Sequence, residues 1–333
     1  MKSYNAIDLM RFVAALFVIS IHTDPFLDLS PAFNYIWVSG VCRVAVPFFF
    51  MASGYFFFKK LDGHSGSGEK QTFLLIYAKK LLKLYVLWSL IYLPLQAMVW
   101  LAKGGGWQYW GEYLQKFFFE GSYYTLWYLP SLLFAVVFSY CLFKFLKPKF
   151  VMYITFTLFV AGTLLQSYYD LFQQQDLLSW YYALFLTTRN GLFFGSFFVS
   201  AGIYLAMFGE KRKPRKDLWY CILFFLFLLL EVSLLRGESF TKGNGMWLML
   251  APAVYFLFSF LRNAGLRNRP IYRMLRPISF LMYVSHGLFL LTVGIVFQMN
   301  SFLYSTAIVV LSFLFSIGFI YIGKKNRFIR QLY

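Results

Sequence analysis

The feature that most constrains the fold of this chain is a series of apolar runs long enough to cross a membrane. A helix of about 20 apolar residues spans the roughly 30 Å hydrocarbon core of a bilayer. Of the 333 residues, 60% are hydrophobic and only 13% are charged, whereas about 25% of the residues of a soluble domain are charged. We therefore predict an all-α fold, a polytopic transmembrane helical bundle that forms one domain over residues 1–333.

The basic residues indicate how the bundle is oriented. About ten spans are predicted, at residues 6–23, 36–58, 80–101, 125–145, 150–167, 190–209, 218–235, 246–262, 277–297 and 302–322. Of the 31 Lys and Arg residues, 24 lie in or beside the segments that become cytoplasmic when the N-terminus is inside, and five lie on the other side. Because Lys and Arg are retained in the cytoplasm, this bias predicts N-in and C-in. The first span is expected to be retained rather than cleaved as a signal peptide.

The connecting segments and the cysteines narrow the possible functions. The net charge of +18 would suggest nucleic acid in a soluble protein, but here the cations separate the spans, so no nucleic-acid partner is predicted. The 59–79 loop is Gly/Ser-rich and predicted to be flexible. Cys42, Cys141 and Cys221 are far apart within apolar runs, so neither a disulfide nor a metal site is predicted.

Charged residues in the first span mark a candidate site, since they are costly in lipid and normally face the protein interior. Asp8 and Arg11 are three residues apart and share a helix face. Arg11 and His22 are almost three whole turns apart, about 16 Å at 1.5 Å per residue, and point the same way. The alternative is an Arg11 that reaches the interface beside Asp8 and a His22 bonded at the outer surface.

Polar residues in three further spans extend this site. In the second span Arg43 has no acid one turn away, Pro47 can kink the helix, and Gly54 allows close helix contact. The ninth span places Tyr283 and His286 on one face. For Glu231, in the seventh span, structural and functional roles both stay open.

These motifs together resemble the membrane-bound acyltransferase-3 family, and the similarity covers the whole chain. The first-span pattern D-x-x-R followed by ten residues and His resembles its main signature, and the runs RVAVPFFFMASGY, TLWYLPSLL and SFLMYVSH look like its other blocks. The residues that match are Asp8, Arg11, His22, Arg43, Pro47, Ser53, Gly54, Trp127, Tyr128, Ser279, Tyr283 and His286. Many members of that family also carry an extracytoplasmic hydrolase-like domain, which we do not expect here.

The resemblance implies transfer of an acyl group from cytoplasmic acyl-CoA, expected to be acetyl-CoA, to a hydroxyl acceptor such as a cell-envelope glycan. It implies that Asp8, Arg11, Ser53 and Trp127 bind acyl-CoA, which is a co-substrate rather than a tightly bound cofactor. His22 would be the general base, or less favourably the carrier of the acyl group.

The remaining catalytic roles are assigned by residue type. Arg43 and Tyr283 would stabilise the oxyanion, and His286 would share acid–base work or bind the acceptor. The expected location is a bacterial cytoplasmic membrane, which the chain crosses many times, and a homo-oligomer is compatible with the sequence.

Two alternatives compete with an enzyme. The first is a transport module for a small amino acid such as serine, because the membrane part of vancomycin-resistance serine racemases resembles the same family. The lack of paired short, Gly/Pro-broken spans weakens an inverted-repeat transporter. The second is a membrane scaffold, which would leave Arg11, Arg43, His22 and His286 without a purpose.

Overall fold

The described residues of the chain are helices and their connections. The computed structural model describes residues 4–169, 179–209, 214–236, 245–296 and 299–333. Its α-helices are α1 (Asn5–Thr23), α2 (Pro31–Ile36), α3 (Ala45–Leu61), α4 (Ser67–Ala102), α5 (Trp107–Phe119), α6 (Tyr128–Phe145), α7 (Pro148–Gln166), α8 (Ser179–Phe185), α9 (Ser196–Phe208), α10 (Pro214–Leu234), α11 (Leu250–Asn263), α12 (Pro270–Val296) and α13 (Ser301–Lys325). Short π- or 3₁₀-helical turns are η1 (Trp37–Val41), η2 (Cys42–Val44), η4 (Gly191–Gly195) and η5 (Ile329–Leu332). The predicted all-α fold is confirmed.

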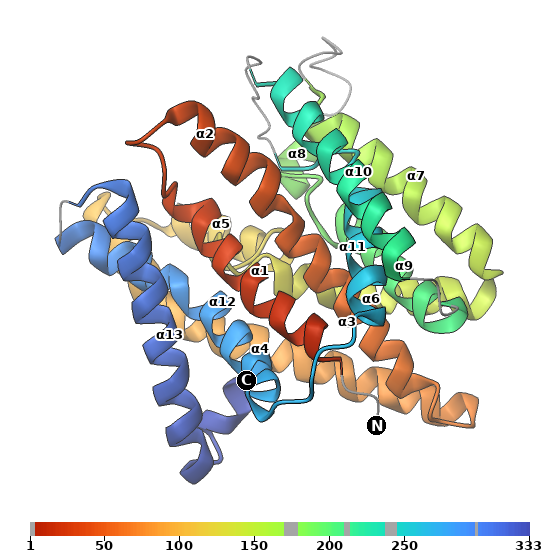
Figure 1. Ribbon diagram of the computed structural model, residues 1–333. Helices are drawn as coiled ribbons and strands as arrows, with labels where there is room; N and C mark the ends of the chain where they lie inside the picture. Colours follow the sequence, from red (N-terminus) through yellow and green to blue (C-terminus); the bar gives the residue numbers. More distant parts are fainter. Residues whose placement is uncertain (1–3, 170–178, 210–213, 237–244, 297–298) are drawn as a thin grey trace.

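Helix α1 is central to the bundle and packs against α12, α3 and α13 (Figure 1). Helices α3 and α9 pack more closely than any other pair of described helices, because small residues at their contact allow the two backbones to approach. A Cβ on Gly54 would collide with the Val199 carbonyl, and a Cβ on Gly202 would collide with the Met51 carbonyl. This confirms the predicted close approach at Gly54.

The outer helices expose apolar side chains. Helix α10 exposes Trp219, Leu226 and Leu230, each more than half accessible, and α13 exposes Phe302 and Leu314 to a similar degree. In water these surfaces would be unfavourable, whereas acyl chains solvate them. The chain is therefore an integral membrane protein.

Nine of the predicted spans form helices long and apolar enough to cross a membrane within the described residues. The one remaining predicted span, 246–262, is shorter than expected, because its helix α11 has only 14 residues, or about 21 Å at 1.5 Å per residue. It still connects the two ends of the bundle. Gly245, just before it, lies beside Arg43, while Leu266 and Arg267, just after it, accept hydrogen bonds from Asn5 at the start of α1.

Glu231 explains how the non-helical entry to α11 is tolerated. Its carboxylate accepts hydrogen bonds from the backbone N–H groups of Leu248 (2.7 Å) and Met249 (2.9 Å), and the Tyr168 hydroxyl also donates to it. Unbonded N–H groups at a helix start are costly away from water. Glu231 thus caps α11 from a neighbouring helix, and of its two open roles the structure supports the structural one.

Several connections between the predicted spans contain helix. The prediction of a flexible 59–79 loop is wrong from Ser67 onward, because α4 begins there and continues into the third predicted span. Phe57 holds this extension in place by packing on Phe73 and Tyr77. The 102–124 connection contains α5, and part of the 168–189 connection lies outside the described residues.

Candidate functional site

At the predicted cytoplasmic end of α1, two arginines share one buried carboxylate. Asp8, 1% exposed, accepts from Arg11 at 3.3 Å and from Arg276 of α12 at 2.6 Å. Both guanidiniums also lie over the Phe56 ring, at 4.8 and 5.9 Å from its centroid. We call Asp8, Arg11 and Arg276 the inner cluster. Its two cations and one anion leave a net positive charge.

A cavity opens beside the inner cluster. Its empty space is about 520 Å³, counted together with the part that is open to solvent, and it is lined by Arg11, Phe49, Ser53, Tyr128, Arg276, Ser279, Phe280 and Tyr283. The hydroxyls of Ser53 and Tyr128 are 3.1 Å apart and hydrogen-bonded to each other. We call it the inner cavity. It brings together Arg11 and Ser53, two of the residues predicted to bind acyl-CoA, and that role stays a prediction.

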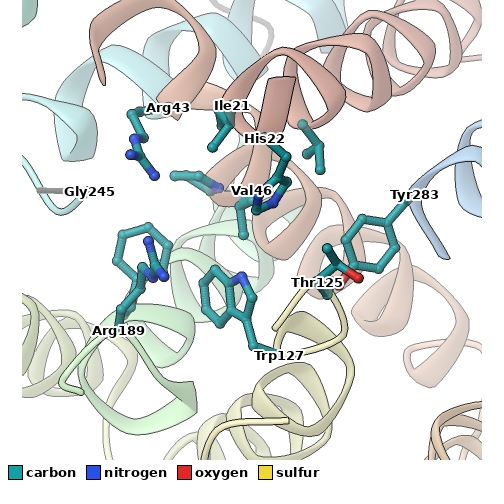
Figure 2. A pocket seen from close by; sticks show the side chains of 12 residues that line it. Ile21, His22, Arg43, Val46, Thr125, Trp127, Arg189, Gly245 and Tyr283 are labelled. Carbon is teal, nitrogen blue, oxygen red and sulfur yellow. Dashed lines mark hydrogen bonds between the residues drawn. The ribbon is translucent and has the colours of Figure 1, made fainter. Parts of the chain in front are cut away.

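A second cavity, the outer cavity, lies toward the other end of α1 and shares Tyr283 with the first (Figure 2). Its empty space is about 490 Å³, counted together with the part that is open to solvent, and it is lined by Val18, Ile21, His22, Arg43, Val46, Pro47, Thr125, Trp127, Arg189, Phe194, Gly245 and Tyr283. The two cavities therefore follow the polar face of α1, from Arg11 to His22.

Arg43 and Arg189 extend into the outer cavity from opposite sides (Figure 2). A Cβ on Gly245 would lie 3.0 Å from Nη1 of Arg189 and 3.2 Å from Nη1 of Arg43, so the two guanidiniums are close neighbours. Within the described part of the chain, neither forms a salt bridge with a carboxylate. The buried Nε of Arg43 has no hydrogen-bond partner there either. We call Arg43 and Arg189 the outer pair.

Irregular helical turns place both residues of the outer pair. Arg43 lies in the 3₁₀ turn η2, which follows the π turn η1 in the second span. Pro47, four residues on, has no N–H to bond the Arg43 carbonyl, which favours such a break. Arg189 precedes the π turn η4, where the Asn190 side chain accepts from the N–H groups of Leu192 and Phe193. Such turns often occur at functional sites.

His22 and His286 form a stacked pair with ring centroids 5.3 Å apart and planes 29° apart. His286 is fully buried, and its Nδ1 lies 2.6 Å from the Tyr283 carbonyl. A carbonyl only accepts, so Nδ1 carries the hydrogen and Nε2 is left as an acceptor. Nε2 has no partner among the described residues. His22 also contacts the Tyr124 ring in a T-shaped arrangement, with ring centroids 5.3 Å apart.

The structure separates some residues that the sequence grouped. Trp127, predicted to bind acyl-CoA with Arg11, lies in the outer cavity, where the Arg189 guanidinium stacks 5.1 Å from its ring centroid. Tyr283, predicted as an oxyanion donor, directs its hydroxyl proton to the Thr125 carbonyl at 2.6 Å. It forms the boundary between the cavities, and its catalytic role stays a prediction.

Sequence reasoning missed Arg189 and Arg276. Both were counted with the basic residues at span ends, as topology signals rather than site residues. For Arg189, the polar run TTRNG directly before an apolar span was an available signal. For Arg276 the signal was weaker, because several arginines share its segment.

The fold and the two adjoining cavities define a class: an integral membrane protein of helical bundle architecture with its polar site inside the bundle. The chain belongs to the acyltransferase-3 family, whose model, described as an acyltransferase domain, matches residues 4–321. The predicted family is thus confirmed, and the motif residues at both ends of α1 lie within the matched range.

The curated relatives of the chain are named as racemases rather than as acyltransferases. The chain is 31% identical over 279 residues to an amino-acid racemase of Enterococcus faecalis, covering 80% of this chain and 38% of the relative. It is 33% identical over 257 residues to a serine/alanine racemase of Enterococcus gallinarum, covering 76% and 36%. A second amino-acid racemase of Enterococcus faecalis is 28% identical over 348 residues, covering 98% and 47%. The chain thus spans less than half the length of these relatives. No solved structure matches it.

Proposed function

We propose that the chain is an O-acyltransferase that moves an acyl group, expected to be acetyl, from cytoplasmic acyl-CoA to a hydroxyl acceptor such as an envelope glycan. The observation that carries this proposal is the pair of adjoining cavities along α1, with a cationic cluster at one end and an imidazole at the other. The family match supports acyl transfer as the reaction class.

The donor would enter from the cytoplasmic end. Arg11 and Arg276 face the inner cavity, and guanidinium groups bind phosphates through paired, charge-assisted hydrogen bonds. The roughly 16 Å between Arg11 and His22 along the helix suits an extended pantetheine arm. Anchoring the phosphates at the inner cluster would thus bring the thioester past Tyr283 to His22.

The reaction then needs a base and an oxyanion stabiliser. His22 takes the proton of the acceptor hydroxyl as its oxygen attacks the thioester carbonyl. Arg43 stabilises the negative charge that develops on the carbonyl oxygen. The carbon–sulfur bond then breaks, the imidazolium returns the proton to the CoA thiolate, and the acyl ester leaves. His286 would orient the His22 ring by stacking on it.

The test is acyl transfer from acetyl-CoA by the purified full chain, with hydrolysis and transfer to added glycans both measured. His22→Ala should reduce transfer by about 10³-fold, within the range of general-base catalysis. His64→Ala is the matched control, because His64 lies outside both cavities. Wild-type transfer rates in a folded His22→Ala protein would reject His22 as the base.

A transport module for a small amino acid is the second candidate. It is favoured by the outer pair, which suits an α-carboxylate, and by the one relative named as a serine/alanine racemase. Uptake of labelled serine into proteoliposomes separates the two functions. Serine uptake without any transfer or hydrolysis of acetyl-CoA would replace the enzyme by the transporter.

A further inference from the structure

Arg189 is the cation that the proposed reaction does not use. One guanidinium, that of Arg43, is enough for the developing oxyanion, yet a second extends into the same cavity (Figure 2). Stacking on Trp127 holds its plane, and its backbone N–H donates to the Thr187 hydroxyl at 3.0 Å. The guanidinium is therefore positioned by its surroundings, while no described carboxylate lies within salt-bridge distance of it and Glu120 acts on it only from further away.

The outer pair is unfavourable as it stands. Like charges held close together repel, and the repulsion is stronger away from bulk water. Intramembrane charges normally have partners, as Arg11 and Arg276 have in Asp8. An anion between Arg43 and Arg189 would relieve this repulsion, and the buried Nε of Arg43 has no partner among the described residues.

The surroundings indicate what kind of anion fits. Gly245 leaves the space next to both Nη1 atoms open, since even one added carbon would lie about 3 Å from each (3.0 and 3.2 Å). The other walls combine apolar Val46, Pro47 and Phe194 with a few neutral polar groups, such as those of Thr125 and Trp127, so beyond the two arginines the cavity offers few donors. A planar, singly charged carboxylate matches the fork of a guanidinium and needs fewer donors than a phosphate.

From these observations we propose that Arg189, with Arg43 beside it, binds a carboxylate of the acceptor. The acceptor is then a hydroxy acid, whose hydroxyl lies at His22 while its carboxylate lies at the outer pair. This deepens the proposed function by naming the substrate class. It makes Arg189 the residue that selects acidic over neutral acceptors.

Binding of matched probes to the purified full chain tests the proposal without acyl-CoA. The probes are glycerate against glyceramide, for a small acid, and glucuronate against glucose, for a sugar acid. In at least one pair the acid should bind about tenfold or more tightly than its neutral counterpart, as expected for a charge-assisted pair. The pair that shows this preference identifies the acceptor as a small acid or a sugar acid. Equal binding, or no binding, of acid and neutral probes in both pairs overturns the proposal.

Variants then test the residue. Arg189→Gln should bring the acid and neutral probes to within about twofold of each other, and Arg189→Lys, which keeps the charge but loses the fork, should retain part of the preference. The matched control is Arg236→Gln, an exposed arginine on the same side. A preference that survives Arg189→Gln, in protein with an unchanged unfolding midpoint, overturns the role of Arg189. If Arg189→Gln does not fold, the partial loss in Arg189→Lys decides.

Failure of this proposal and failure of the enzyme proposal give different results. Acid-selective binding without any acyl transfer rejects the O-acyltransferase and keeps the carboxylate site. Acyl transfer to neutral and acidic acceptors at equal rates keeps the enzyme and rejects the carboxylate site.

Discussion

The inner cluster and the outer pair hold the same kind of cation in opposite electrostatic situations. Arg11 and Arg276 share the carboxylate of Asp8, and the Arg276 side chain is 48% exposed. Arg43 and Arg189 have each other as neighbours and no described carboxylate within salt-bridge distance. The first arrangement can persist without a ligand at little cost, whereas the second costs stability until an anion arrives.

This difference separates two functions of intramembrane charge. The inner cluster links α1 to α12 and still has one positive charge to offer a phosphate. Within the described residues the outer pair joins no two helices through a salt bridge, and its one tertiary ring contact, Arg189 on Trp127, needs no second cation beside it, so anion binding is the role that we propose for the pair. Active sites often retain charges that lower the stability of the fold, because the same charges are needed for binding or catalysis. Substitutions at the two sites should therefore change stability in different directions.

Of changes at the two cationic sites, the one with the largest expected effect is at the outer pair, and the effect is on activity. Arg43→Gln should reduce acyl transfer about 100-fold, the magnitude for loss of one oxyanion donor. The same variant should unfold at an equal or higher temperature, because an uncompensated charge is removed from the interior. Transfer assays and thermal unfolding in detergent measure both. A clear fall in the unfolding midpoint would remove the contrast between the two sites.

The next effect is on stability, at the inner cluster. Asp8→Asn should lower the free energy of unfolding by about 2 kcal/mol, within the range for hydrogen bonds to charged groups, because Arg11 and Arg276 lose their shared acceptor charge. The half-exposed Arg276 keeps the loss below that of a fully buried pair. Chemical unfolding measures it, with the exposed Asp62→Asn as control. An Asp8→Asn protein as stable as the control would mean that the cluster does not hold the helices.

Much of this architecture could be predicted from the sequence, because membrane spans are a property of composition over about 20 residues. The helical fold and the close approach at Gly54 required only run lengths and residue sizes. The short α11 could not be foreseen in the same way. Its length depends on Glu231 bonding the backbone of Leu248 and Met249 from another helix, and sequence spacing carries no signal for that contact.

The candidate site was predictable only where its residues lie deep within a span. Arg11, His22 and Arg43 stand out against apolar neighbours. Arg189 does not, since a cation at a span end is also what topology alone requires. Whether Arg189 is a site residue or only a topology signal depends on whether its side chain turns toward the interior. The π turn η4 and the Trp127 ring decide that here, through tertiary packing.

The smallest effect that still sharpens the comparison is on donor affinity, at Arg11. Arg11→Gln should weaken acyl-CoA binding by about tenfold, because one charge-assisted phosphate contact is lost while Arg276 remains beside the inner cavity. Added salt should weaken wild-type binding more than that of the variant, since fewer charges then attract the donor. Titration of acyl-CoA at two ionic strengths measures both effects.

Arg189→Gln is the matched comparison, and it should leave donor affinity unchanged, because Arg189 lies in the outer cavity. If Arg189→Gln weakened acyl-CoA binding as much as Arg11→Gln did, the donor phosphates would lie at the outer pair, and the two ends of α1 would have to exchange roles.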